Sequence, residues 1–402
     1  MKKSLLALAV AAFAASSASA AVVYDQDGTS LAVGGRIQAV AYSQDANQGG
    51  QPASGDASLV GSARVNLAMR TQLTDGIAGF AFVEWDAADS DKKQTFDARD
   101  LYVSADFGAF GKLQAGRFRD AVYQGVTSTT DIFDDWGCDG QLGNDDRREG
   151  MIMYSWSGWG VDFKASYETA KDNVKVDGAW FEGEEADIKG GFAVSLGYTS
   201  PDVLFGPIAV KAGYGYYRFQ DDYATMDFSD TADEDGDFGN TNRTYDNYKQ
   251  WAAALSWGVK GAGPLVAVMY QARDFDTNGT YFYKNSSGAI FSDAAADDYT
   301  VSGVEAVVGY GFDCGVGIYT GWEWMNIDFD HQDIDVDAYT IPVYVNYQIA
   351  PNFNVWAEAR FDAGTDDGKG FKGFDNVTAT MAGKKMTNFE ENVYSIGARY
   401  TF

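Results

Sequence analysis

Apolar and polar residues alternate one by one at the end of the chain, and this pattern constrains the fold more than any other. The apolar set is Tyr394, Ile396, Ala398, Tyr400 and Phe402, and the polar set is Ser395, Gly397, Arg399 and Thr401. Successive side chains of a β-strand point to opposite faces, so the pattern predicts a strand with one apolar face. Residues 353–362 and 339–349 repeat it, although Pro342 weakens the second prediction because proline cannot donate to a ladder.

Strand candidates continue backwards through the chain and are joined alternately by short and long connections. Sixteen strands are expected, beginning near residues 29, 60, 76, 94, 112, 147, 161, 190, 207, 248, 264, 297, 316, 337, 353 and 388. Short turns at one end and long acidic loops at the other are typical of an outer-membrane barrel, and an even strand number brings both termini to one side. The pattern predicts an all-β, antiparallel up-and-down transmembrane barrel. Fourteen or eighteen strands, or a secreted β-sandwich, remain open on this ground.

The start of the chain predicts export. Lys2 and Lys3 precede an apolar stretch that ends in Ala18-Ser19-Ala20, which is the pattern of a cleaved secretory signal peptide over residues 1–20. The remaining residues, 21–402, are expected to form a single barrel domain. After Ala21 no apolar run of about 18 residues occurs, which argues against a membrane protein built from helices.

Composition excludes several classes of function. The net charge is −28, whereas binding to nucleic acid needs a surplus of Lys and Arg on the contacting face. The chain has one His and two Cys and lacks the usual hydrolase, nucleotide-binding and zinc-protease motifs, so we expect no enzyme activity, no metal site and no cofactor. The two cysteines, Cys138 and Cys314, fall at opposite ends of the expected barrel, too far apart for a disulfide.

Several segments resemble the general bacterial porins. They are the start at residues 21–31, the pair Gly35-Arg36, the central run Phe110–Arg117 and the terminus Ala398–Phe402. The resemblance implies a sixteen-stranded barrel in the outer membrane of a Gram-negative bacterium, in contact with lipid and lipopolysaccharide and assembled as a homotrimer. It also implies that Phe402 is read by the barrel-assembly machinery, and that the solutes are ions and small hydrophilic molecules.

In that family the third external loop folds inward and narrows the pore with carboxylates. Here the connection 120–146 follows the fifth strand, and its segment Thr130–Gly137 resembles the family's loop motif. The resemblance therefore places Asp131 and Asp135 at the constriction, with Asp134 as the alternative. Glu84 lies at a position where the family has a further carboxylate in the lumen.

The resemblance also places a basic wall opposite these carboxylates, formed by Arg36, Arg64, Arg99 and Arg147. Alternation independently turns Arg36 and Arg64 inward, because their strand neighbours on either side are apolar. For Arg99, alternation allows Asp100 to point inward instead, and no pattern decides between Arg147 and Arg148. Arg117 is expected to make a structural contact.

The expected function is a passive, water-filled general diffusion porin with a charged constriction and a mild preference for cations. Removing residues 1–20 takes away Lys2 and Lys3 and changes the net charge from −28 to −30. The alternatives are a sugar-selective porin, which would have eighteen strands and an aromatic track, and a structural or adhesive barrel.

Overall fold

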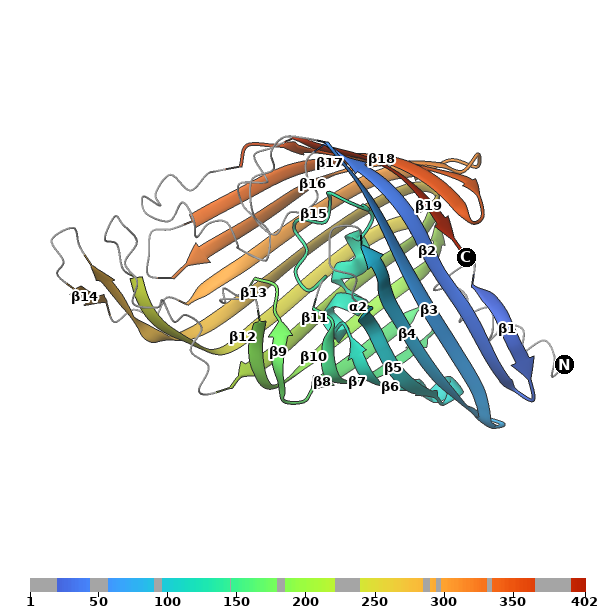
Figure 1. The fold of residues 1–402 in the computed structure, drawn as a ribbon, viewed down its shortest axis with the longest axis horizontal. Coiled ribbons are helices and arrows are strands. Elements are labelled where there is room, and N and C mark those ends of the chain that lie inside the picture. Colours follow the sequence, from blue (N-terminus) through green and yellow to red (C-terminus); the bar gives the residue numbers. More distant parts are fainter. Residues whose placement is uncertain are drawn as a thin grey trace.

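The strands of the chain close into a barrel (Figure 1). The computed structural model describes residues 20–43, 57–89, 96–144, 146–178, 185–220, 239–284, 290–293, 298–330, 335–365 and 392–402. Residues 1–19, and with them nearly all of the predicted signal peptide, lie outside the described residues.

Within the described residues, sixteen strands form the barrel, which confirms the predicted number. In chain order they are β2 (Thr29–Tyr42), β3 (Ser58–Thr74), β4 (Ile77–Asp89), β5 (Asp97–Asp106), β6 (Lys112–Phe118), β7 (Arg148–Gly158), β8 (Val161–Glu168), β10 (Glu185–Val203), β11 (Gly206–Phe219), β12 (Gly239–Val259), β13 (Ala262–Lys284), β15 (Tyr299–Gly311), β16 (Val316–Phe329), β17 (Asp335–Ala350), β18 (Phe353–Asp362) and β19 (Val393–Thr401).

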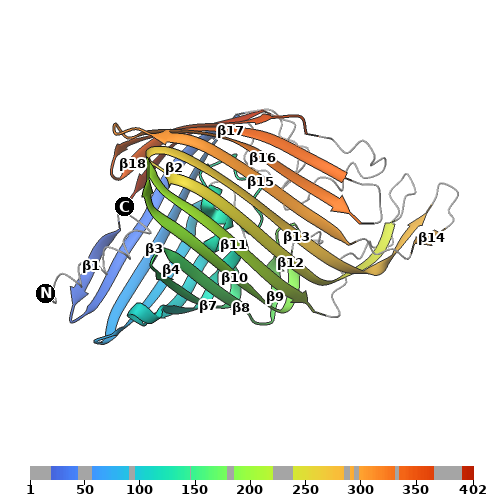
Figure 2. The ribbon, with the colours of Figure 1, turned by 180° about the vertical axis from the view of Figure 1, so that it is seen from behind.

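Each strand pairs antiparallel with its neighbours, and β19 pairs with β2 to close the sheet. The wall that carries β10 to β13 and β15 to β17 is seen from behind in Figure 2. Asp27 and Gly28 both have positive φ, 51° and 75°, which is the type I′ turn that matches the twist of a hairpin. That turn joins β2 to β1 (Ala21–Gln26), which lies on the same edge of β2 as β19.

The two faces of the sheet differ as alternation predicts. Outward side chains are large, apolar and exposed; Val103 and Ile396, for example, are 61% and 68% exposed. Their neighbours in sequence, Ser104 and Ser395, point inward and are buried. An apolar outer band with polar residues inside is the arrangement of a barrel that faces lipid. None of the helices in the described residues is long and apolar enough to cross a membrane.

The structure differs from the predicted strands where backbone pairing between strands occurs without an alternation of apolar residues. β12 begins nine residues earlier than predicted, because its polar first half continues the ladder with β13 beyond the point where apolar alternation begins. Three short strands were not predicted: β1 on β2, β9 (Lys171–Lys175) on β10 and β14 (Ile290–Asp293) on β13. Pro342 lies inside β17, where the β16–β17 pairing skips it and Thr320 Oγ1 donates to its carbonyl at 2.9 Å.

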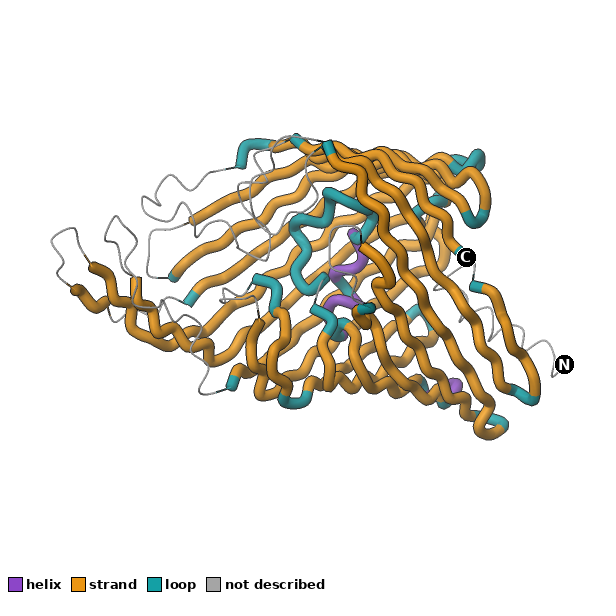
Figure 3. The backbone as a smooth tube through the Cα atoms, viewed as in Figure 1, coloured by secondary structure: helices purple, strands orange, loops and turns teal. Residues whose placement is uncertain are grey.

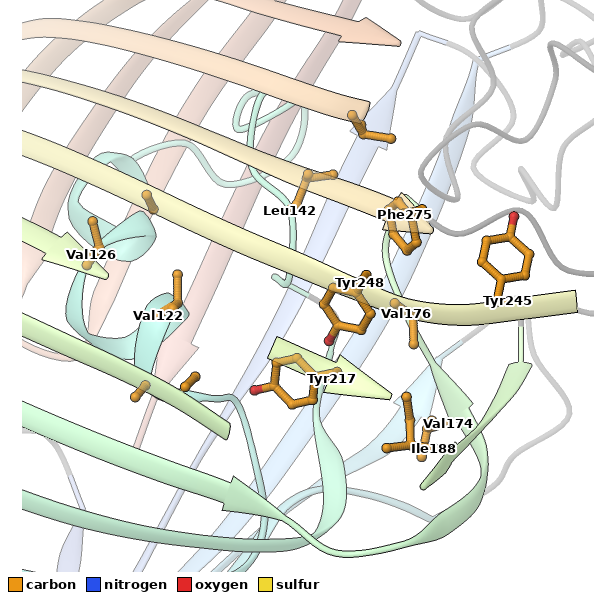
Figure 4. Packing of buried hydrophobic residues seen from close by; sticks show 14 of the residues in the cluster. Val122, Val126, Leu142, Val174, Val176, Ile188, Tyr217, Tyr245, Tyr248 and Phe275 are labelled. Carbon is orange, nitrogen blue, oxygen red and sulfur yellow. The ribbon is translucent and has the colours of Figure 1, made fainter. Parts of the chain in front are cut away.

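Parts of the barrel interior are densely packed. One buried apolar cluster joins Val122, Val126 and Leu142, from the connection between β6 and β7, to aromatic residues of β11 to β15 (Figure 4). A second cluster packs Ile132, Phe133 and Cys138 of the same connection against residues of β16, β17 and β18. This connection, residues 119–147, is called the β6–β7 loop below.

Candidate functional site

The β6–β7 loop begins with two short helices. Asp120 is the N-cap of helix α2 (Ala121–Gly125). Its carboxylate accepts a hydrogen bond from the backbone N–H of Tyr123 at 2.8 Å. Such an N-cap satisfies one of the free donors of the first turn. A 3-10 helix, η2 (Thr127–Thr130), follows, and the described residues between it and β7 form bends and turns. Figure 3 shows both helices, in purple, within the outline of the barrel.

The tip of the loop is bound by one carboxylate of the barrel wall. Glu358 on β18 accepts four backbone N–H groups of residues 134–137, at 2.7 to 3.0 Å. Its side chain is buried. Charge-assisted hydrogen bonds of this length are stronger than neutral ones, so one glutamate orders four successive residues of the loop.

Two further glutamates continue this attachment. Glu323 on β16 accepts from the backbone N–H of Cys138 at 2.7 Å and from Thr340 Oγ1 at 2.9 Å. Glu305 on β15 accepts from Gln141 Nε2 at 2.8 Å. In the closed strand order β15 and β16 are far from β6 and β7, where the loop begins and ends.

The acidic residues of the tip are themselves engaged with the wall. Asp134 pairs with Arg399 of β19 at 2.8 Å and accepts from Tyr344 at 2.7 Å. Burial opposes ionisation of Asp134, but the charge of Arg399 and the hydrogen bonds from Arg399 and Tyr344 outweigh it and lower the pKa of this carboxyl.

Asp135 has a different environment. Its carboxylate accepts hydrogen bonds from Trp356 Nε1, Ser395 Oγ and Tyr42 Oη at 2.6 to 3.2 Å. Burial raises the pKa of Asp135, because no cation pairs with it among the described residues and Asp134 is adjacent. The two neighbouring carboxyls therefore differ in acidity.

Asp131, the other predicted constriction residue, is exposed. One of its oxygens accepts from Tyr123 Oη at 2.8 Å, which links it to helix α2 of its own loop. Its other oxygen lies 3.8 Å from Cys138 Sγ, also of the loop. Among the described residues, Asp131 is thus the predicted acidic residue of the loop whose carboxylate is not hydrogen-bonded to a strand of the barrel wall.

Of the arginines predicted for the opposite wall, Arg36 and Arg64 lie on the adjacent strands β2 and β3, Arg99 lies on β5, and Arg147 is the last residue of the loop before β7. Arg36 of β2 and Arg64 of β3 are register partners and share the inward face. Arg64 pairs with Asp86 at 2.7 Å, and Arg99 pairs with both Glu84 and Asp86 at 3.1 Å. Arg36 forms no ion pair with the described residues.

The inward turn of Arg99 depends on an irregularity in pairing. The β4–β5 register shifts between Val83 and Trp85, so that Arg99 reaches Glu84 although simple alternation would group it with outward Leu101. The carboxylate of Asp100 also has an ionic partner, because its Oδ2 lies 3.5 Å from Arg147 Nε. Alternation could not decide this pair because the shift inserts an extra residue.

Arg147 and Arg148 divide their roles. Arg148 is 3% exposed and pairs with Asp146 at 2.7 Å and Glu168 at 2.9 Å. Arg273 of β13 joins the same carboxylate of Asp146. Burial opposes ionisation of Asp146, but the two arginines lower the pKa of this carboxyl. These contacts fix the end of the loop, whereas Arg147 turns toward Asp100.

Residues 7–367 of the chain match the Gram-negative porin family. The chain belongs to this family. Among relatives, the porin-like protein L of Photobacterium profundum is 27% identical over 411 residues, which cover 100% of both chains. The outer membrane porin PhoE of Enterobacter cloacae is 31% identical over 223 residues, which cover 50% of this chain and 60% of that protein.

Solved structures agree on the fold. Salmonella typhi OmpF has a TM-score of 0.65 at 16% identity and covers 95% of this chain and 100% of its own. A loop L8 deletion mutant of Vibrio cholerae OmpT has a TM-score of 0.62 at 16% identity, with 94% and 100% covered. The family and the names of the relatives make this protein a porin of the outer membrane.

Sequence reasoning missed Arg399, Asp86 and the three glutamates that hold the loop. Alternation does place Arg399 on the inward face, so its orientation could have been predicted from the sequence. Its partner Asp134 lies 265 residues away, and no local pattern joins them. Phe402, the predicted assembly signal, exchanges backbone hydrogen bonds with Gly35 at 2.8 and 2.9 Å, which fixes the C-terminus beside β2.

Proposed function

We propose that the porin is a general diffusion channel for ions and small hydrophilic solutes, narrowed by an inward-folded β6–β7 loop. The observation that carries this proposal is the bonding of the loop to Glu305, Glu323 and Glu358, on strands remote from those it connects. A sixteen-stranded barrel alone is too wide to select by charge, so a loop held across it supplies the selectivity.

In the constriction we propose, exposed Asp131 lies opposite Arg36. Beside Arg36, the charges of Arg64 and Arg99 are neutralised in ion pairs that include Glu84. Asp134 and Asp135 hold the loop to the wall, and Asp134 offsets the charge of Arg399. Arg147 stabilises the inner end of the loop through Asp100. Opposed charges across a narrow passage produce a transverse field that favours polar solutes.

Mild cation preference is part of the proposal. The mature chain carries −30, and its negative potential gathers cations within about 8 Å of the charges at physiological salt. Arg36 opposes this effect, so the preference is weak and falls as salt rises. No bond is made or broken in the passage of solute, and neither metal nor cofactor is required.

The partners we propose are two further copies of the chain in a homotrimer, outer-membrane lipid and lipopolysaccharide, and the barrel-assembly machinery, which would read Phe402. Nucleic acid is not a partner. The solved structures that resemble the chain include an OmpT of Vibrio cholerae in a trimer form, which supports the trimer. Export by a signal peptide over residues 1–20 completes the proposal.

The competing functions are a sugar-selective porin and a structural or adhesive barrel. Single-channel conductance in planar bilayers, with a series of sugars added, separates the three. A general diffusion channel conducts KCl and shows no saturable block by any sugar. Saturable block by one sugar would favour the selective porin, and absence of conductance would favour the structural barrel.

A further inference from the structure

The inward face of β3 to β6 carries an aromatic and basic patch near the end of the barrel with the short turns. Its members, called the aromatic patch below, are Arg70, Phe80, Phe82, Tyr102, Ser104 and Lys112. Cross-strand register places Arg70, Phe80 and Ser104 in one row and Phe82 beside Tyr102 in the next. Lys112 begins β6 and is the register partner of Asp106.

The side chains of the aromatic patch face the barrel interior. Leu101 and Val103, which flank Tyr102 in sequence, are 50% and 61% exposed on the outer face. The rings of Phe82 and Tyr102 stack with centroids 5.4 Å apart and planes at 30°. Lys112 Nζ lies 5.5 Å from the centroid of Tyr102, and the guanidinium of Arg70 lies 5.7 Å from that of Phe80.

Like Arg36, the two cations of the aromatic patch differ from the ion-paired arginines of the interior. Arg64, Arg99 and Arg399 all pair with carboxylates. Across the part of the chain that the structure describes, neither Arg70 nor Lys112 has a carboxylate within ion-pair distance. The neighbouring Asp106 instead accepts from the backbone N–H of Gly108 at 2.7 Å, in the adjacent turn.

Two buried polar atoms of the aromatic patch also lack partners among the described residues. They are Arg70 Nε and Ser104 Oγ, and their residues are only 9% and 8% exposed. The guanidinium of Arg70 donates to Gln72 Oε1 and has its remaining donors uncommitted. Buried polar groups are normally paired, so unpaired donors beside aromatic rings indicate a place for a ligand that brings acceptors.

We propose that the aromatic patch binds small aromatic carboxylates, of the benzoate class, as they enter the lumen. The ring of such a solute stacks on Phe82 and Tyr102, and its carboxylate accepts from Arg70 and Lys112. Guanidinium matches carboxylate in geometry, and aromatic rings stack in an offset fashion. Farther along β4, Glu84 and Asp86 pair with Arg99 and Arg64, so these arginines compete only weakly with the aromatic patch for the anion. This inference rests on the proposed channel function, because the solute reaches the site through water.

Block of the KCl current of the purified porin in planar bilayers tests the inference. The probes are benzoate, acetate, cyclohexanecarboxylate and benzamide. We expect benzoate to reduce the conductance saturably. Acetate lacks the ring, cyclohexanecarboxylate lacks a flat ring and benzamide lacks the charge, so these three should block only at much higher concentrations. R70Q and K112Q should each raise the half-blocking concentration about tenfold, the effect of one charged hydrogen bond, and F82A about fivefold.

The matched control is K164Q, which removes a lysine of β8 outside the aromatic patch and should leave the block unchanged. Equal block by benzoate and acetate, or block insensitive to both R70Q and K112Q, would overturn the inference. If the wild-type protein carries no KCl current, the channel function fails instead. Saturation-transfer NMR of benzoate with the detergent-solubilised protein then decides the binding: a signal lost in R70Q supports the aromatic patch, and no signal refutes it.

Discussion

Arg36 differs from the other arginines beside it in having no ionic partner among the described residues, although it lies next to Arg64 in the register. A charge without a partner acts on passing ions, whereas Arg64 and Arg99 are offset by Asp86 and Glu84. Arg36 and exposed Asp131 are therefore the two residues whose replacement should change selectivity most.

Replacing Arg36 by Gln should raise the cation-to-anion permeability ratio about twofold to threefold, the combined effect on cation and anion of one charge at about 7 Å in water screened by physiological salt. Asp131→Asn should lower the ratio by a similar factor. Reversal potentials in a KCl gradient measure both. Lys171→Gln, which removes a partner of Glu149 on β9, is the control. If Arg36→Gln behaves like this control, Arg36 does not line the path of the ions.

Asp134 and Asp135 should respond differently to pH. The pKa of Asp134 is lowered, so the stability it contributes is present above the ordinary carboxyl value of 3.8 and is lost as pH falls through the lower folded value. Asp134→Asn should destabilise the barrel by about 1 to 3 kcal/mol at neutral pH, because it leaves Arg399 unpaired. Urea unfolding midpoints should converge with the wild type at low pH; a gap that persists there would argue against the ion pair.

The raised pKa of Asp135 has the opposite sign, because its ionised form is the disfavoured one in the folded state. Ionisation of Asp135 weakens the folded state as pH rises through the folded pKa, and protonation restores that stability. Asp135→Asn should therefore cost less stability than Asp134→Asn at neutral pH, in the same urea assay. A larger cost would mean that its three hydrogen bonds outweigh burial.

At the scale of elements, the attachment of the β6–β7 loop depends on Glu358. Glu358→Ala removes the acceptor of four backbone donors and should produce large fluctuations in single-channel current, with a loss of stability of at least about 2 kcal/mol. Glu358→Gln keeps one carbonyl acceptor and should give an intermediate effect. A quiet channel of unchanged conductance in Glu358→Ala would show that the loop is held by its apolar contacts alone.

The reactivity of the two cysteines tests the position of the β6–β7 loop. Cys138 is buried within it, where burial raises the pKa of the thiol, and Cys314 is exposed in the short turn after β15. A thiol reagent should modify one cysteine per chain in the native protein and two after denaturation. Absence of any free thiol after denaturation, with a linked Cys138–Cys314 peptide in mass spectrometry, would contradict both the loop position and the strand order.

Alternation predicted the strands well because period-two patterns are local, and the inward turn of Arg36 and Arg64 followed from it. It failed at Arg99 because a register shift inserts a residue, and at the start of β12 because the ladder there is polar. The partners of Glu358 are more than 220 residues distant along the chain, so no local pattern could have revealed them.

At the scale of the whole molecule, small outward residues on β2 favour close packing of barrels. Ala39 and Ala41 are exposed, whereas the ring of Phe402 covers the position above Gly35. We expect a heat-resistant trimer in mild detergent, with three times the mass of one chain by light scattering. A monomeric mass would refute the trimer, and Ala39→Trp, which enlarges this surface, should lower the temperature at which the trimer dissociates.

We propose that the lumen is an open passage whose charge is set by the β6–β7 loop and by the arginines opposite it. The reversal potential of the wild-type porin in a KCl gradient tests it most directly. We predict a weak preference for K⁺ that declines as salt concentration rises. A preference for Cl⁻, or one that does not change with salt, would show that the loop and its arginines do not set the charge of the passage in this way.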